Sequence, residues 1–147
     1  MTGKSFKIRP FRDADEKAVV KLWHDCDLVV PWNDPQRDIR LKLQVNPEWF
    51  LVGLLGDDLI ATVMAGYEGH RGWINYLAVH PDHRRKGFAT QIMAEAESLL
   101  NAVGCPKINL QVRSKNTAVI SFYKSLGWQV EDIVNLGKII NYQPSTE

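Results

Sequence analysis

Three things are scarce in this chain of 147 residues: cysteine, long apolar runs, and a surplus of one charge. The two cysteines, Cys26 and Cys105, are too few for a disulfide framework and match no metal-ligand spacing, so we expect buried free thiols. The longest apolar stretches, near 49–55 and 59–65, have the length of strands and cannot cross a bilayer. The net charge of +1 lacks the basic surplus that is typical of nucleic-acid-binding proteins.

What remains is the composition of an ordinary globular protein. The apolar share is 45% and the charged share is 24%, and the length fits one domain over residues 1–147. The first residues lead into an alternating segment without the apolar core of a signal peptide. We therefore expect a single cytoplasmic domain that acts on neither membranes nor nucleic acids.

The apolar periodicity predicts an α+β domain with the element order β-α-α-β-β-β-α-β-α-β-β. The predicted strands cover 6–11, 49–55, 59–67, 73–79, 108–112, 128–134 and 138–142, followed by a frayed tail from residue 143. Asp13 and Glu16 predict a capping box for a first helix through residue 23. Asp34, followed by Pro35, predicts the start of a second helix. Two further helices are predicted over 87–103 and 116–126.

The segment 77–89, LAVHPDHRRKGFA, carries the clearest chemical signal. A strand ends before Pro81, and the cations Arg84, Arg85 and Lys86 precede Gly87 at the start of a helix. The first amides of a helix lack internal partners and lie at the positive end of its dipole, which favours a phosphate or pyrophosphate. A run of three cations is otherwise typical of a solvated surface, but the strand–loop–helix context favours an anion site. The chain has neither a P-loop nor a dinucleotide-binding fingerprint.

The residues RRKGFA, 84–89, resemble the R/Q-x-x-G-x-G/A motif of the GCN5-related N-acetyltransferase (GNAT) superfamily. The segments 110–116 and 122–128 resemble its second cofactor region, and 31–35, 66–72 and 104–108 are similar to the bacterial YpeA-type subgroup. This resemblance implies a GNAT-like mixed, mostly antiparallel central sheet with helices on both faces. It also implies acetyl-CoA as the co-substrate.

The resemblance also implies a role for each matching position. The backbone of Leu77 to Val79 would pair with the pantetheine arm like an added strand, and the Val79 amide would be the oxyanion donor. Asn116 would bind the pantetheine end, and Tyr123 would lie near the sulfur as general acid. The implied cofactor-binding residues are Leu77, Ala78, Val79, Arg84, Arg85, Lys86, Gly87, Phe88, Ala89, Thr90, Asn116 and Tyr123.

The helical spacing supports part of this assignment independently. Asn116, Ile120 and Tyr123 are spaced i, i+4 and i+7, so they share one face of the predicted helix. That face could line one side of a cofactor slot. Tyr123 is equally explained as a core residue with a hydrated hydroxyl.

The general base is less evident. Several members of the superfamily place a glutamate where this chain has Gln111, and glutamine cannot accept a proton. The candidates left are Glu68, His70, Tyr76 and Asp34, or a chain of waters. Each has a simpler explanation: Asp34 as a helix cap, Glu68 and His70 as solvated turn residues, and Tyr76 as packing.

The acceptor side is predicted from the two early helices and the loop 30–34. Trp32 could wall a pocket there, although it could equally pin the loop to the core. We expect the acceptor to contact Trp32, Asp34, Glu68 and Tyr76. An α-amine, with a pKa of about 8, loses its proton at neutral pH far more readily than a lysine side chain, at about 10.4. An acceptor of lowered pKa is therefore favoured.

The sequence thus predicts an N-acetyltransferase that moves an acetyl group from acetyl-CoA to a primary amine. The acceptor would be a small metabolite or an α-amine, for example of a peptide, attacking directly through a tetrahedral intermediate. The main alternative is a non-catalytic acyl-CoA-binding or sensor domain on the same scaffold. A nucleic-acid module built on the loop cations is disfavoured by the net charge of +1. The histidines show no ligand spacing, so no metal site is expected, and a homodimer stays open.

Overall fold

The structure, a computed structural model, describes residues 3–140. The chain forms two compact units, one ending at Leu110 and one beginning at Gln111, and each is described by itself. The tail predicted from residue 143 and the last two residues of the strand predicted over 138–142 lie outside the described residues.

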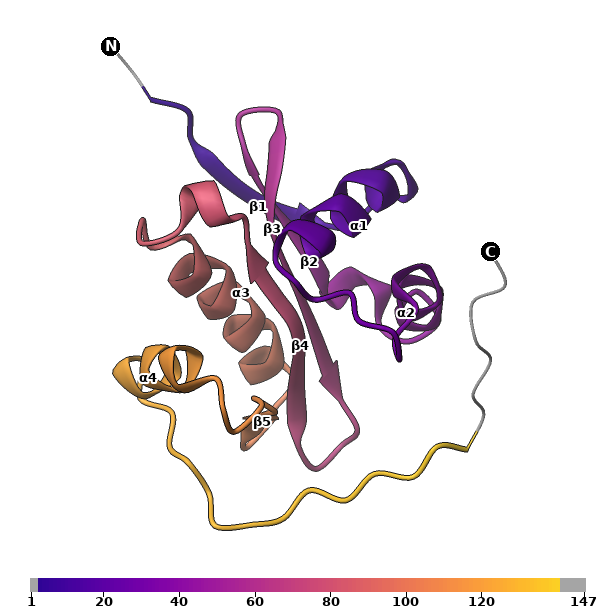
Figure 1. Cartoon of the computed structure of the whole chain (residues 1–147), viewed down its shortest axis with the longest axis vertical. Helices are drawn as coiled ribbons and strands as arrows, with labels where there is room; N and C mark the ends of the chain where they lie inside the picture. The colour runs from indigo at the N-terminus through magenta and orange to yellow at the C-terminus, as the bar shows by residue number, and fades with distance from the viewer. Residues whose placement is uncertain (1–2, 141–147) are drawn as a thin grey trace. The chain divides into compact units, whose positions relative to one another are not determined.

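The first unit is built on one five-stranded sheet in the order β1-β2-β3-β4-β5 (Figure 1). Its strands are β1 (Phe6–Pro10), β2 (Phe50–Leu55), β3 (Asp58–Tyr67), β4 (Gly72–Val79) and β5 (Ile108–Leu110). The first four are antiparallel neighbours, whereas β5 runs parallel to β4. A mixed, mostly antiparallel sheet is thus confirmed.

Helices cover both faces of this sheet (Figure 1). Helices α1 (Glu16–Asp25) and α2 (Pro35–Lys42) lie on one face, and α3 (Phe88–Ala102) lies on the other. Every residue of β3 from Ile60 to Ala65 is buried, which is typical of a strand covered on both sides rather than on one. The core on the α1 and α2 face consists of Phe11, Val19, Leu22, Trp23, Ile39, Phe50, Val52, Met64 and Ala78.

The start of α2 is as predicted, and that of α1 is not. Asp34 accepts a hydrogen bond from the Arg37 amide at 3.1 Å, with Pro35 in the first helical position. Before α1, a 3-10 turn over Asp13–Asp15 comes first, and the Arg12 amide donates to Asp15 at 2.8 Å. The predicted box of Asp13 and Glu16 is therefore wrong. Asp15 takes that role because its carboxylate also binds Arg9 of β1, at 2.7 Å.

The described part of the second unit, residues 111–140, contains one helix, α4 (Thr117–Ser125), which begins after Asn116 as predicted. Its side-chain oxygen accepts from the Val119 amide at 3.3 Å. The strand predicted over 128–134 is wrong, and residues 138–140 form no strand either. Among the described residues of this unit, 111–140, no strand pairs with them, and apolar side chains such as Val134 (83% exposed) and Leu136 (91%) are exposed to solvent. An alternating sequence alone cannot supply the partner that a strand needs.

In residues 3–140, no helix has both the length and the apolar character needed to cross a bilayer.

Candidate functional site

The site begins at a bulge in β4. Thr62 lies opposite Ala78 and Met64 opposite Asn75, so that two β4 residues, Tyr76 and Leu77, share one position of β3. Tyr76 has a φ of 51°, in the left-handed region, which costs about 1–3 kcal/mol for a residue other than glycine. Because β5 pairs only with residues 72–74 of β4, the later part of β4 has no β5 partner.

A polar network compensates for this strained residue. The Tyr76 hydroxyl donates to the Asp38 carboxylate at 2.6 Å and accepts from the Asn33 amide at 2.8 Å. The Tyr76 carbonyl accepts from the Thr62 hydroxyl at 2.9 Å, and Thr62 in turn accepts from the indole of Trp23 at 2.9 Å. The rings of Tyr76 and Trp23 stack with centroids 3.8 Å apart. Burial, and then the hydrogen bond to Asp38, raise the pKa of Tyr76 well above its usual value.

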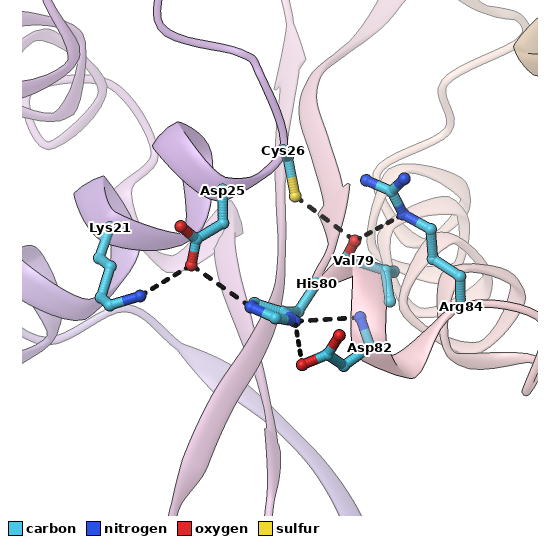
Figure 2. Close-up of polar contacts among 7 residues, drawn as sticks. All are labelled: Lys21, Asp25, Cys26, Val79, His80, Asp82 and Arg84. Carbon is cyan, nitrogen blue, oxygen red and sulfur yellow. Dashed lines mark hydrogen bonds and ion pairs between the residues drawn. The ribbon is translucent and has the colours of Figure 1, made fainter.

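At the end of β4, side chains bind the Val79 carbonyl (Figure 2). It accepts from the Cys26 thiol at 3.4 Å and from the Arg84 guanidinium at 3.1 Å. A carbonyl oxygen has two lone pairs, so both are engaged. A pantetheine amide could pair with this carbonyl only by displacing one of these donors. Cys26 is half-buried rather than fully buried as predicted, and burial raises the pKa of its thiol.

The next residue ties the loop to α1. The His80 amide donates to the Ile60 carbonyl at 2.8 Å, and its ring lies between Asp25 and Asp82 (Figure 2). Nε2 is 3.3 Å from the Asp25 carboxylate, and Nδ1 accepts from the Asp82 amide at 3.1 Å. Asp25 also binds Lys21 at 2.9 Å, and this contact lowers the pKa of the Asp25 carboxyl. The start of the cationic loop is thus anchored to the C-terminal end of α1.

The loop itself leaves backbone donors open at the start of α3. Gly87 has a φ of 83°, and a Cβ placed on it would meet nothing within 4 Å. The first helical hydrogen bond runs from the Gln91 amide to the Gly87 carbonyl, at 3.1 Å. The amides of residues 88–90 precede that bond, so they have no acceptor within the helix. Arg85 and Lys86 are exposed beside them.

The predicted acceptor residues are not gathered around one group. Asp34 is occupied as the α2 cap, and Trp32 is 62% exposed. Glu68 accepts from the amides of His70 and Arg71 in the turn after β3. These bonds lower the pKa of the Glu68 carboxyl, which makes it a weaker base. Tyr76 lies in the network described above, and the Asp34 carboxylate is close enough to contribute to the rise of its pKa.

Two predicted site residues belong to the second unit. Asn116 caps α4 with its side-chain oxygen, and Tyr123 is 9% exposed, with its ring against Phe122 and Trp128. Burial raises the pKa of Tyr123 to about 12, so the hydroxyl keeps its proton at neutral pH. In the same unit Gln111, at the position of the expected glutamate, donates to the side chain of Asn135.

Sequence reasoning missed Asn33, Asp38, Thr62 and Cys26. Asp38 lies one helical turn after Asp34, a spacing that could have drawn attention to it. The others gave no signal, because their partners are 14 or more residues away in sequence, apart from local contacts of Asn33. Among residues 3–140, no group of three or more His, Cys, Asp or Glu side chains is placed to hold a metal ion.

The comparisons with known proteins agree with this architecture. Residues 17–128 match the model of the "Acetyltransferase (GNAT) family". An acetyltransferase of Yersinia enterocolitica is 47% identical over 132 residues, which cover 90% of this chain and 94% of that protein. The chain therefore belongs to the GNAT acetyltransferase family.

Two solved structures illustrate the shared fold. The PaiA N-acetyltransferase of Thermoplasma acidophilum, in complex with coenzyme A, aligns with a TM-score of 0.71 at 19% identity, covering 88% of this chain and 93% of that one. The ribosomal-protein-S18-alanine N-acetyltransferase of Escherichia coli aligns with a TM-score of 0.70 at 20% identity, covering 84% and 77%. At these identities the likeness extends to the fold alone.

Proposed function

We propose that this chain transfers an acetyl group from acetyl-CoA to a primary amine of a small metabolite or to an α-amine. The observation that carries the proposal is the start of α3: the amides of residues 88–90 lack helical acceptors, and Gly87 leaves the space beside them open. Such a helix start binds a diphosphate. The related structure with bound coenzyme A supports this reading of the scaffold.

The remaining roles follow the end of β4. The neutral amine attacks the thioester carbon, a C–N bond forms, and the C–S bond breaks as the thiolate leaves. The proton that the nitrogen loses passes to water. We assign the Val79 amide as oxyanion donor, which is worth on the order of 3 kcal/mol, and Leu77 and Ala78 as edge contacts of the pantetheine arm. Asn116 and Tyr123 are assigned to the pantetheine end and to protonation of the thiolate.

The properties of two candidate bases, Glu68 and Tyr76, favour an acceptor amine that loses its proton without strong help from a base. Glu68 has a lowered pKa, and the hydroxyl of Tyr76 keeps its proton, so neither is suited to deprotonate a lysine-like amine. An α-amine at about pH 7 needs only about 1 kcal/mol to lose its proton, against roughly 4–5 kcal/mol for a lysine side chain. The name of the Escherichia coli relative refers to an alanine of a ribosomal protein. We therefore place α-amines first among the acceptors.

The experiment combines calorimetry with turnover. We expect coenzyme A to bind, and release of its thiol from acetyl-CoA to accelerate with α-amine peptides more than with an Nα-blocked lysine at pH 7. No uptake of coenzyme A would refute the proposal. Binding without turnover on any amine would identify a sensor domain instead, and a preference for the blocked lysine would refute the choice of acceptor.

A further inference from the structure

We propose that Asp38 and Asn33 are positioning residues that act through the Tyr76 hydroxyl to hold the β4 bulge in the form that receives acetyl-CoA. This inference rests on the proposed function and adds residues to which that function gives no role. Neither side chain needs to contact the substrate. Both would act by fixing the backbone of Leu77 to Val79, directly after Tyr76.

Tyr76 is held at three separate groups. Its hydroxyl acts as both donor and acceptor, since it donates to Asp38 at 2.6 Å and accepts from the Asn33 side-chain amide at 2.8 Å. Its ring stacks on Trp23, and its carbonyl accepts a hydrogen bond from the side chain of Thr62. Of the three groups, the hydroxyl is the one that binds residues of the α1–α2 loop (Asn33) and of α2 (Asp38).

The network also fixes the loop from which it comes. The Asn33 side chain accepts from the Val30 backbone amide at 2.7 Å and donates to the Leu28 carbonyl at 3.2 Å. These two local hydrogen bonds fix the orientation of the side-chain amide that donates to the Tyr76 hydroxyl. Asp38 is held on α2, whose buried Ile39 packs in the core with Trp23. The Tyr76 hydroxyl is therefore held by two side chains whose own positions are fixed, one in the α1–α2 loop and one on α2.

The bulge determines where the following backbone groups point. Two β4 residues share one position of β3, and loss of the extra residue would shift the register by one. A one-residue slip turns every following group to the opposite side. The Val79 carbonyl, which now meets Cys26 and Arg84, would turn with them. The proposed edge for the pantetheine arm exists only while Tyr76 keeps its left-handed backbone.

The test uses conservative variants, because Tyr76→Phe keeps the ring stacked on Trp23 while removing the hydroxyl. We expect Tyr76→Phe and Asp38→Ala to weaken coenzyme A binding at least about fivefold in calorimetry. The KM for acetyl-CoA should rise by a similar factor. Asp38→Asn should recover part of the affinity, since its amide oxygen can still accept from the hydroxyl. Tyr67→Phe, whose hydroxyl donates to Gly69 at 3.0 Å, and the turn variant Asp57→Asn are matched controls expected to stay within twofold.

Each result decides the question. Unchanged coenzyme A affinity with a lower Tm would make the network purely structural and overturn the proposal. A raised KM for the amine with unchanged coenzyme A affinity would also overturn it, because the residues would then contact the acceptor. If the unaltered protein did not bind coenzyme A, the proposed function itself would fail, which is a distinguishable result.

Discussion

Two neighbouring stretches, 76–79 and 84–90, differ in whether their backbone groups have hydrogen-bond partners. From Tyr76 to Val79, the side chains of five other residues bind either a backbone carbonyl or the Tyr76 hydroxyl. From Arg84 to Thr90 the backbone turns through left-handed residues and leaves amides without helical acceptors. An edge that must keep a strained shape needs side-chain partners, whereas a seat for an anion must keep its donors unpaired.

The largest effect should come from Gly87→Val in the open stretch. A β-branched residue at a φ of 83° is strained, and its side chain would stand beside the amides of residues 88–90. We expect coenzyme A affinity to fall about 100-fold, or roughly 2.7 kcal/mol, by calorimetry. Gly69→Val is the matched control, since Gly69 has a φ of 104° and equal space around it. Equal losses of affinity in both variants would contradict the diphosphate seat.

Next in size is Thr62→Val in the pinned stretch. Thr62 is fully buried and joins the Trp23 indole to the Tyr76 carbonyl, so valine removes the hydroxyl that both groups bind. We expect the free energy of unfolding to fall by about 2 kcal/mol in urea titrations. Thr117→Val, at an exposed position of α4, should change it by less than about 0.5 kcal/mol. Similar values for the two variants would mean that the network stabilises little.

A smaller effect is expected at Tyr123 of the second unit, whose ring packs against Phe122 and Trp128. Proton transfer from a phenol whose pKa is raised to about 12 to a thiolate whose thiol has a pKa of about 8.5 is unfavourable. We expect Tyr123→Phe to lower kcat about tenfold, below the usual range for a general acid. The wild-type kcat should show no loss from tyrosine ionisation below pH 10. A change under twofold would show that the thiolate leaves unaided.

The smallest effect concerns the Arg9–Asp15 pair, which joins β1 to the turn before α1. The hydrogen bond from Arg9 lowers the pKa of Asp15 below its unfolded value, so the pair stabilises the fold above about pH 4 and this contribution is lost as the pH falls through the folded pKa. Asp15→Asn should cost about 1 kcal/mol at pH 7, and the difference from wild type should shrink in acid.

Chemical unfolding at several pH values measures this difference. Asp58→Asn, which breaks the exposed contact with Lys4 at 3.7 Å, is the control and should cost less than about 0.5 kcal/mol. A gap between Asp15→Asn and wild type that stayed constant down to pH 2 would contradict the role of the pair.

The sequence predicted most of the fold because most elements carry their own signals. The Asp34–Pro35 start of α2, the hairpin of β2 and β3, and the switch to helical period after Gly87 are local patterns, and all three are present. The capping box of α1 was placed on Asp13 and Glu16 because the pattern could not show that Asp15 faces Arg9. The strand predicted over 128–134 failed because alternation describes only one of the two strands that a ladder requires.

The sequence by itself determined the motif at 84–89, for which we propose diphosphate binding, and the family to which the chain belongs. Both are written in neighbouring residues whose spacing follows directly from the chain. Only the tertiary structure decided that Tyr76 is a bulge residue held by Asn33 and Asp38, and that Cys26 and Arg84 engage the Val79 carbonyl. Most of those contacts join residues 38 or more positions apart. A hydrogen bond depends on the positions of both partners, and the sequence does not show which distant residues the fold brings together.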